Sequence, residues 1–150
     1  MKILGLDLGS KTLGIAISDA LRLTAQGVET FTFKENHFQD AIERVKAIIQ
    51  NEKIEKIILG YPKNMNGTIG ERGKLSEIFA RKLEKELNIQ VVLWDERMST
   101  LEAEKILIGA NMSRQKRKKI IDKMAAVVIL QSYLNSIKWG ERNGWKLFKS

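Results

Sequence analysis

The sequence predicts an α/β fold. We expect a five-stranded mixed sheet, made of three antiparallel strands and then two parallel additions, with helices on both faces. Size and composition support this, because 150 residues, 43% hydrophobic and 29% charged, suit one domain with one core. Three strand-like segments open the chain. Helical segments and short apolar runs then alternate, an order that implies crossover connections and a sheet covered on both sides.

Three antiparallel strands are expected in the first third of the chain. Apolar runs at Ile3–Leu8 and Leu13–Ser18 are joined by a short connection that contains Gly9, which is typical of a β-hairpin. Side chains alternate in character along Gly27–Phe33, and this period of two predicts the third strand.

A helix and a buried strand follow. Apolar residues recur at steps of three and four from Phe38 to Ile49, which predicts an amphipathic helix with Asn36 as its N-cap. The brief apolar run Ile57–Gly60 predicts a buried strand, which Pro62 stops.

The second half of the chain repeats this alternation. A polar loop with three glycines spans 62–73 and leads into a helix over 74–87. Val91–Trp94 predicts another buried strand, and the next helix runs from about Ser99 to Gly109. One long final helix is expected after that. Its apolar side is formed by Ile120, Met124, Val127, Val128 and Leu134.

Residue types that are missing or rare exclude several classes of site. The chain has no cysteine, which excludes disulfides, thiolate zinc sites and cysteine nucleophiles, and suits a reducing cytosol. Its one histidine, His37, argues against a histidine-rich metal site and a Ser-His-Asp triad. Oxygen ligands remain for any metal, and they favour Mg²⁺ or Mn²⁺ over Zn²⁺.

We expect a cytoplasmic protein that enters no membrane. The longest apolar run, Met124–Leu130, is far shorter than the roughly 20 residues of a membrane span. Asp7 and Lys11 interrupt the first apolar stretch, so no signal peptide is visible. Lysine and arginine number 26 against 18 acidic residues. The net charge of +8 favours a polyanionic partner such as nucleic acid, although a merely soluble, charged surface explains it equally well.

Acidic residues at three places do not fit their surroundings. Asp7 lies inside an apolar strand, where a carboxylate is costly unless it is paired or bound to metal. The alternative is a residue that caps the following turn. Asp95 and Glu96 follow a buried strand, at the end where α/β sheets place their sites, or they simply start the next helix. Asp122 is followed by small residues at 125–126 that would let its helix approach the sheet, or it is a solvated acid beside lysines.

As a set, these acids are more specific than any one of them. Carboxylates from a strand, a strand end and a helix are the hard oxygen ligands that Mg²⁺ prefers. Two ions in such a site polarise a phosphodiester and activate water. The hypothesis requires that the three places meet in space.

Four motifs occur in order along residues 1–137. They are GLDLGSKTLGIA from Gly5, GYPKNMNG from Gly60, DERMST from Asp95 and DKMAA from Asp122. Together they resemble the YqgF family, the group of pre-16S rRNA nucleases that are also called RuvX or Holliday-junction-resolvase-like proteins. The resemblance implies a single RNase H-like nuclease domain over 1–137. A basic and aromatic C-terminal tail at 138–150 follows, and we expect it to be loosely held.

The resemblance implies catalytic, metal-binding acids at Asp7, Glu96 and Asp122, with Mg²⁺ or Mn²⁺ as the cofactor. Glu96 is preferred to Asp95 on the family pattern alone. Related RNase H-like resolvases carry an acid near the end of the fourth strand, and here that place is Gly60-Tyr61-Pro62. We therefore expect a metal site that is built differently from theirs or binds metal more weakly.

Basic residues near these acids are candidate contacts for nucleic acid. Loop 62–73 and the start of the next helix offer backbone N–H groups for a phosphate, unless the loop is an ordinary surface connection. The five positive charges in 114–119 suit salt-sensitive phosphate contacts, with a solvated helix start as the alternative. The candidates are Lys11, Thr12, Lys63, Arg72, Arg97, Arg114, Lys116, Arg117, Lys118 and Lys119. Trp139, Trp145 and Phe148 in the tail suit base stacking, but we favour packing of the tail on the domain.

The leading hypothesis is a metal-dependent nuclease that processes the 5′ end of pre-16S rRNA, as the resemblance implies. Its partners would be RNA and ribosomal particles. Cleavage of branched DNA at Holliday-type junctions is an alternative with the same chemistry. A non-catalytic nucleic-acid-binding factor would use the basic run without needing Asp7. Residues 7–12 also look like the phosphate loop of actin- and hexokinase-like ATPases, but those proteins close two lobes over the nucleotide and this chain has the length for one.

Overall fold

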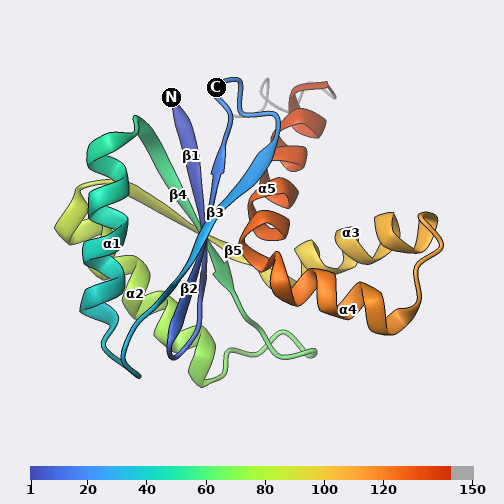
Figure 1. Cartoon of the computed structure of the whole chain (residues 1–150), viewed down its shortest axis with the longest axis horizontal. Helices are drawn as coiled ribbons and strands as arrows, with labels where there is room; N and C mark the ends of the chain where they lie inside the picture. Colours follow the sequence, from blue (N-terminus) through green and yellow to red (C-terminus); the bar gives the residue numbers. More distant parts are fainter. Residues whose placement is uncertain (143–150) are drawn as a thin grey trace.

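A five-stranded mixed sheet forms the centre of the molecule (Figure 1). The computed structural model describes residues 1–142. The strands lie in the order β3-β2-β1-β4-β5; β1 pairs antiparallel with β2 and parallel with β4, β2 and β3 are antiparallel, and β4 and β5 are parallel. Their bounds are β1 (Lys2–Leu8), β2 (Thr12–Ser18), β3 (Ala25–Thr32), β4 (Ile54–Tyr61) and β5 (Gln90–Asp95). The predicted fold class is confirmed.

One face of the sheet is covered by α1 (Phe38–Asn51) and α2 (Glu71–Leu87) (Figure 1). Alternate residues of the strands point toward these helices, because a strand has a period of two. The larger of two apolar cores lies here. It includes Leu4, Leu6, Leu13, Ile15, Ile42, Val45, Ile57, Leu59, Phe79 and Leu83.

The other face is covered by α5 (Ala125–Arg142), which packs on a smaller core (Figure 1). Small residues let this helix approach the sheet closely. A Cβ added at Gly5 would lie 2.6 Å from Leu130 Cβ and 3.2 Å from the carbonyl oxygen of Ala126. The core here includes Ile3, Ala16, Ile58, Ile129, Leu130 and Leu134.

The predicted single long final helix is wrong. The segment forms two helices, α4 (Arg114–Lys123) and α5, which meet at Met124 with a bend of 87°. The bend leaves the strongly basic α4 in solvent and turns the apolar α5 onto the sheet. Neither proline nor glycine marks the break, so the sequence carries no local signal for it. Together with α3 (Glu96–Gly109), α4 projects from the body as an arm (Figure 1).

Several predicted boundaries also need correction. Asn36 is not the N-cap of α1, because it has φ +64° and its N–H donates to the Ser10 carbonyl; His37 is the cap. Helix α2 begins at Glu71 rather than 74, and α3 at Glu96 rather than Ser99. The predicted boundary between domain and tail, at 137, lies within the span of α5 (Ala125–Arg142) and stays a prediction. The rest of the predicted tail, with Trp145 and Phe148, lies outside the described residues.

In the described part of the chain, no single helix is both long and apolar enough to cross a membrane. The bent pair formed by Arg114–Lys123 and Ala125–Ile137 passes such a test on length and composition alone.

Replacing Gly5 by alanine should destabilise the fold, because the new methyl group would overlap Leu130 beneath α5. We expect a loss of about 1–3 kcal/mol in the free energy of unfolding, the usual cost of overpacking. Urea denaturation of Gly5→Ala and wild type measures it. Gly27→Ala is the matched control, since a Cβ there meets its nearest neighbour at an ordinary 3.6 Å. Equal stability of the two variants would contradict the close packing of α5.

Candidate active site

Asp7 lies near the end of β1, where α5 no longer covers the sheet. It pairs in register with Gly14 of β2. A Cβ at Gly14 would lie 3.5 Å from Asp7 Cβ and 3.4 Å from Ala126 Cβ, so this glycine leaves space beside the acid. The half-buried Asp7 therefore lines two cavities, of about 420 and 280 Å³.

Glu96 is the first residue of α3 and reaches back over the sheet to Asp7. A Cβ at Gly60 would lie only 2.6 Å from Glu96 Oε1. The carboxylate thus fills the space above β4 that a β4 side chain would otherwise take. This explains how the chain places an acid beside Asp7 although Gly60-Tyr61-Pro62 contains none.

The carboxyl groups of Asp7 and Glu96 lie close enough to share a hydrogen bond, which requires a proton on one of them. Burial, and then the charge and hydrogen bond of Asp7, raise the pKa of Glu96 to about 7, while the Arg72 guanidinium opposes the shift. A proton shared by close carboxylates is the usual result when no cation lies between them.

Asp95 has different partners from Glu96, because β5 ends at Asp95 and the chain turns into α3. Its carboxylate caps α3 by accepting from the backbone N–H of Arg97 at 2.9 Å. It also accepts from Arg97 Nε at 3.1 and 3.2 Å and from Nη2 at 2.8 Å. These bonds hold the pKa of Asp95 below its usual range.

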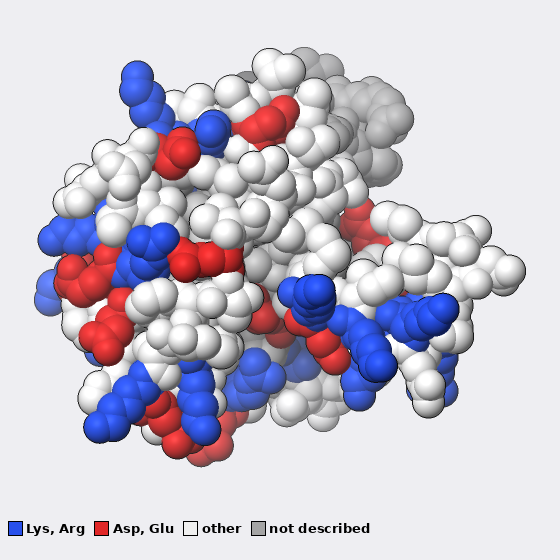
Figure 2. Space-filling view, viewed as in Figure 1, with Lys and Arg blue, Asp and Glu red and all other residues white. Residues whose placement is uncertain are grey.

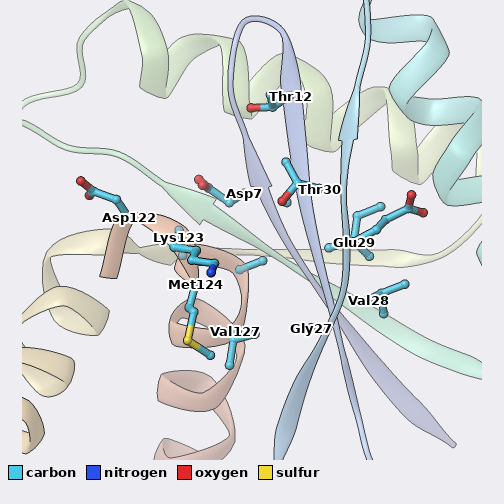
Figure 3. A pocket seen from close by; sticks show the side chains of 14 residues that line it. Asp7, Thr12, Gly27, Val28, Glu29, Thr30, Asp122, Lys123, Met124 and Val127 are labelled. Carbon is cyan, nitrogen blue, oxygen red and sulfur yellow. The ribbon is translucent and has the colours of Figure 1, made fainter. Parts of the chain in front are cut away.

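Asp122 is exposed on the last turn of α4, at the rim of the site. It lines the smaller cavity with Asp7, Glu96 and Arg72, and the larger one with Asp7. Its carboxylate points away from Asp7 in Figure 3. Within residues 1–142, no three acidic, histidine or cysteine side chains stand close enough to hold a metal ion. The structure therefore joins two of the predicted acids and leaves the third at the edge.

Arg72 connects this acidic site with the first hairpin turn. Its Nη2 donates to the Leu8 carbonyl at 3.5 Å. It lines both the cavity of Asp7 and Glu96 and a third cavity, of about 390 Å³, which it shares with Lys11 and Thr12. Thr12 and Arg72 each also share a cavity with Asp7, whereas Lys11 lines only the neighbouring one.

Lys63 and Arg97, two further predicted contacts, gather around Asp95. Lys63 Nζ lies 4.0 Å from Asp95 Oδ2 and 5.4 Å from the centre of the Tyr61 ring. Arg97 Nη1 donates to the Met65 carbonyl at 3.4 Å. Arg97 therefore ties loop 62–70 to the start of α3.

The basic run on α4 divides into one engaged residue and four exposed ones. Arg117 donates at 2.8 Å to both Glu104 Oε2 and the Met112 carbonyl, so it joins α4 to α3. Basic side chains gather on this part of the molecule (Figure 2). The exposed members of the run are Arg114, Lys116, Lys118 and Lys119.

Three residues that line or shape the site were not predicted. Gly60 gives Glu96 its space, and Thr30 and Lys123 line the larger cavity (Figure 3). A glycine at the end of a buried strand is a usable signal for close approach. Thr30, an exposed residue on an edge strand, and Lys123, one of many lysines, carry no such signal in the sequence.

Comparison with known proteins identifies the family. The family model described as "RuvX: Holliday junction resolvase" matches residues 1–136. The chain belongs to the RuvX family. Curated members named "Putative pre-16S rRNA nuclease" are 58% identical over 137 residues in Bacillus subtilis and 55% identical over 136 residues in Listeria monocytogenes. Each match covers 91% of this chain and 99% of the relative.

A solved structure confirms the RNase H-like fold of this RuvX family member. The RuvC of Thermus thermophilus, in complex with a Holliday junction substrate, superposes with a TM-score of 0.62 at 12% identity. The match covers 93% of this chain and 96% of RuvC. At this identity the likeness concerns the fold alone.

Glu96 should make stability fall with rising pH. Folding raises its pKa from 4.5 to about 7, so the folded state binds more protons between these values, and the free energy of unfolding falls as pH rises through them. Glu96→Gln should be more stable than wild type at pH 8 without divalent cations, by roughly 1–3 kcal/mol. Urea unfolding at pH 4 and pH 8 measures this. If the difference in unfolding free energy between wild type and Glu96→Gln were the same at pH 4 and pH 8, the contact between the two carboxyl groups would be contradicted.

Replacing Gly60 by alanine should push the Glu96 carboxylate away from Asp7, because the added methyl group would overlap Oε1. The pKa of Glu96 should then fall from about 7 toward its ordinary 4.5. Carboxyl ¹³C NMR titration of labelled glutamate follows it. Gly109→Ala is the control, since a Cβ there meets nothing within 4 Å. An unchanged titration in Gly60→Ala would show that Gly60 does not govern the position of Glu96.

Proposed function

We propose that this chain is a divalent-metal-dependent nuclease that hydrolyses phosphodiester bonds in structured RNA, with the 5′ end of pre-16S rRNA as its substrate. The observation that carries the proposal is the contact between Asp7 and Glu96 in a solvent-accessible cavity beside Arg72. A relative that is 58% identical, matched over 99% of its own length, is named as a pre-16S rRNA nuclease, which supports the choice of substrate.

The donor set fits a hard divalent cation. Asp7 and Glu96 offer carboxylate oxygens, and their mutual repulsion, visible in the raised pKa of Glu96, is what a bound cation relieves. Asp7 and Glu96 would hold Mg²⁺ or Mn²⁺, with Asp122 as the third acid from the rim. When bound, such an ion supplies polarisation of the phosphodiester and a lowered pKa of the attacking water.

The protein's own side chains orient the substrate. Arg72, next to Glu96, is placed to pair with the phosphate that is cut and with the negative charge that develops on it. Glu96 hydrogen-bonds and orients the attacking water, while Lys11 and Thr12 hold the neighbouring backbone. Asp95 and Arg97 act through position, by fixing loop 62–70 and Lys63 beside the site.

The exposed basic side chains of α4 add contacts that do not depend on the nucleotide sequence of the substrate. Arg114, Lys116, Lys118 and Lys119 bind phosphates further along the substrate, so affinity falls with added salt. Precursor ribosomal particles in the cytoplasm are the setting in which such a substrate is met.

Cleavage of four-way DNA junctions is the second candidate, favoured by the description of the matching family model. A nuclease for such junctions would use the same acids and the same cation.

A nucleic-acid-binding factor without catalytic activity would need neither these acids nor the cation.

End-labelled 16S precursor RNA tests the proposal, as free RNA and within precursor particles, with Mg²⁺, Mn²⁺ or EDTA. Wild type should cut only with the metals. Asp7→Asn should lose at least about 100-fold in rate, the scale of removing one charged group from an active site, and keep its RNA affinity. Asp122→Asn should lose less, because its carboxylate stands apart from the other two.

A four-way DNA junction is assayed in parallel. Cutting of the junction but not of the RNA would favour the second candidate. No cutting of either substrate, or cutting that persists in Asp7→Asn, would overturn the proposal.

A further inference from the structure

Helix α5 covers only part of its face of the sheet. Its contacts centre on Gly5, Ala16 and Ile58, and its first turn reaches Gly14 through Ala126. Beyond these contacts, the strand ends line an open groove. Asp7, Gly14 and Thr30 lie there in one row across β1, β2 and β3, because Gly14 pairs in register with both of the others. The surface therefore continues from the acidic site to the edge of the sheet as a polar platform.

A groove of about 420 Å³ runs along this platform between β3 and the junction of α4 and α5. This volume is within the range of sites for small organic ligands. Thr12 and Thr30 line one wall, and Lys123, Met124 and Val127 line the other (Figure 3). Glu29, although next to Thr30, turns its carboxylate to Arg44 on the opposite face.

The two walls differ in chemistry. A threonine hydroxyl both donates and accepts hydrogen bonds, as does the 2′-hydroxyl that distinguishes RNA from DNA. The ammonium group of Lys123 suits a phosphate, and Met124 and Val127 offer apolar contact to sugar carbons or a base. A ribonucleotide carries these three kinds of group together.

We propose that this groove holds one ribonucleotide of the strand being cut, next to the cleaved bond, with the Thr30 hydroxyl bonded to its 2′-hydroxyl. The groove then selects RNA over DNA at that position. This inference rests on the proposed nuclease function, and it names the feature of the substrate that the site reads.

Three variants isolate the hydroxyl of Thr30. Thr30→Val removes the hydroxyl, retains the shape and suits a strand. Thr30→Ser keeps the hydroxyl. Thr32→Val is the matched control: two residues along β3, it points to the same side of the sheet, is also exposed, and does not line the groove.

The first measurement is affinity, by fluorescence anisotropy in EDTA so that nothing is cut. The probes are a single-stranded oligoribonucleotide from the 5′ end of the 16S precursor and the same sequence as DNA. Wild type, Thr30→Ser and Thr32→Val should prefer the RNA by about tenfold, the scale of one hydrogen bond whose partner is lost. Thr30→Val should bind both probes alike, through weaker binding of RNA and unchanged binding of DNA.

The second measurement is single-turnover cleavage of precursor RNA that carries single 2′-deoxy substitutions around the cut. One position should slow wild type about tenfold, and the same substitution should add nothing in Thr30→Val. Equal loss of RNA and DNA affinity in Thr30→Val would mean that Thr30 contacts a phosphate, and would overturn the proposal. So would a Thr30→Val variant indistinguishable from Thr32→Val.

Failure of the nuclease function has a different signature. If wild type cuts no RNA, the proposed function falls, yet the RNA preference of wild type and its loss in Thr30→Val still decide whether the groove reads a 2′-hydroxyl.

Discussion

The contact between Asp7 and Glu96 is the constraint on which the rest of the site depends. Two carboxylates within hydrogen-bonding distance repel each other, and burial strengthens that repulsion, so one of them keeps a proton up to about pH 7. Gly60 permits this contact, because a side chain at that position would occupy the space that the Glu96 carboxylate fills. The stored repulsion is relieved by a cation, which links the stability of the protein to its chemistry.

Sheet topology brings these two acids together. Because β4 lies between β1 and β5, a residue that follows β5 reaches β1 only by crossing β4. The glycine at the end of β4 makes that crossing possible. On the same face, α5 packs closely on small residues and stops short of the strand ends. The uncovered part of the sheet becomes the groove that carries Thr12 and Thr30 beside Asp7.

The charged residues divide into those that build the site and those left to meet a substrate. Asp95 and Arg97 satisfy each other and fix a loop, and Arg117 with Glu104 fixes the arm. Arg72 faces the acids, and four cations of α4 remain exposed. Formal net charge does not reveal this division, because a paired and an unpaired arginine count equally. The neutral hydroxyls of the groove also contribute nothing to the charge, yet they are the groups suited to telling RNA from DNA.

The sequence by itself determined the order of the strands and of the first three helices, the mixed sheet with helices on both faces, and the motifs that resemble the RuvX family. These follow from the periodicity of apolar residues within each segment and from motifs whose residues are close together in the sequence. Only the tertiary structure decided that Glu96 rather than Asp95 contacts Asp7, because β5 ends between them and the chain turns into α3. It also decided the break at Met124, where unbroken apolar periodicity hides a bend of 87°. The bend follows from the different surroundings of the two helices, because α5 packs on the sheet and α4 is surrounded largely by solvent. The local sequence does not encode those surroundings.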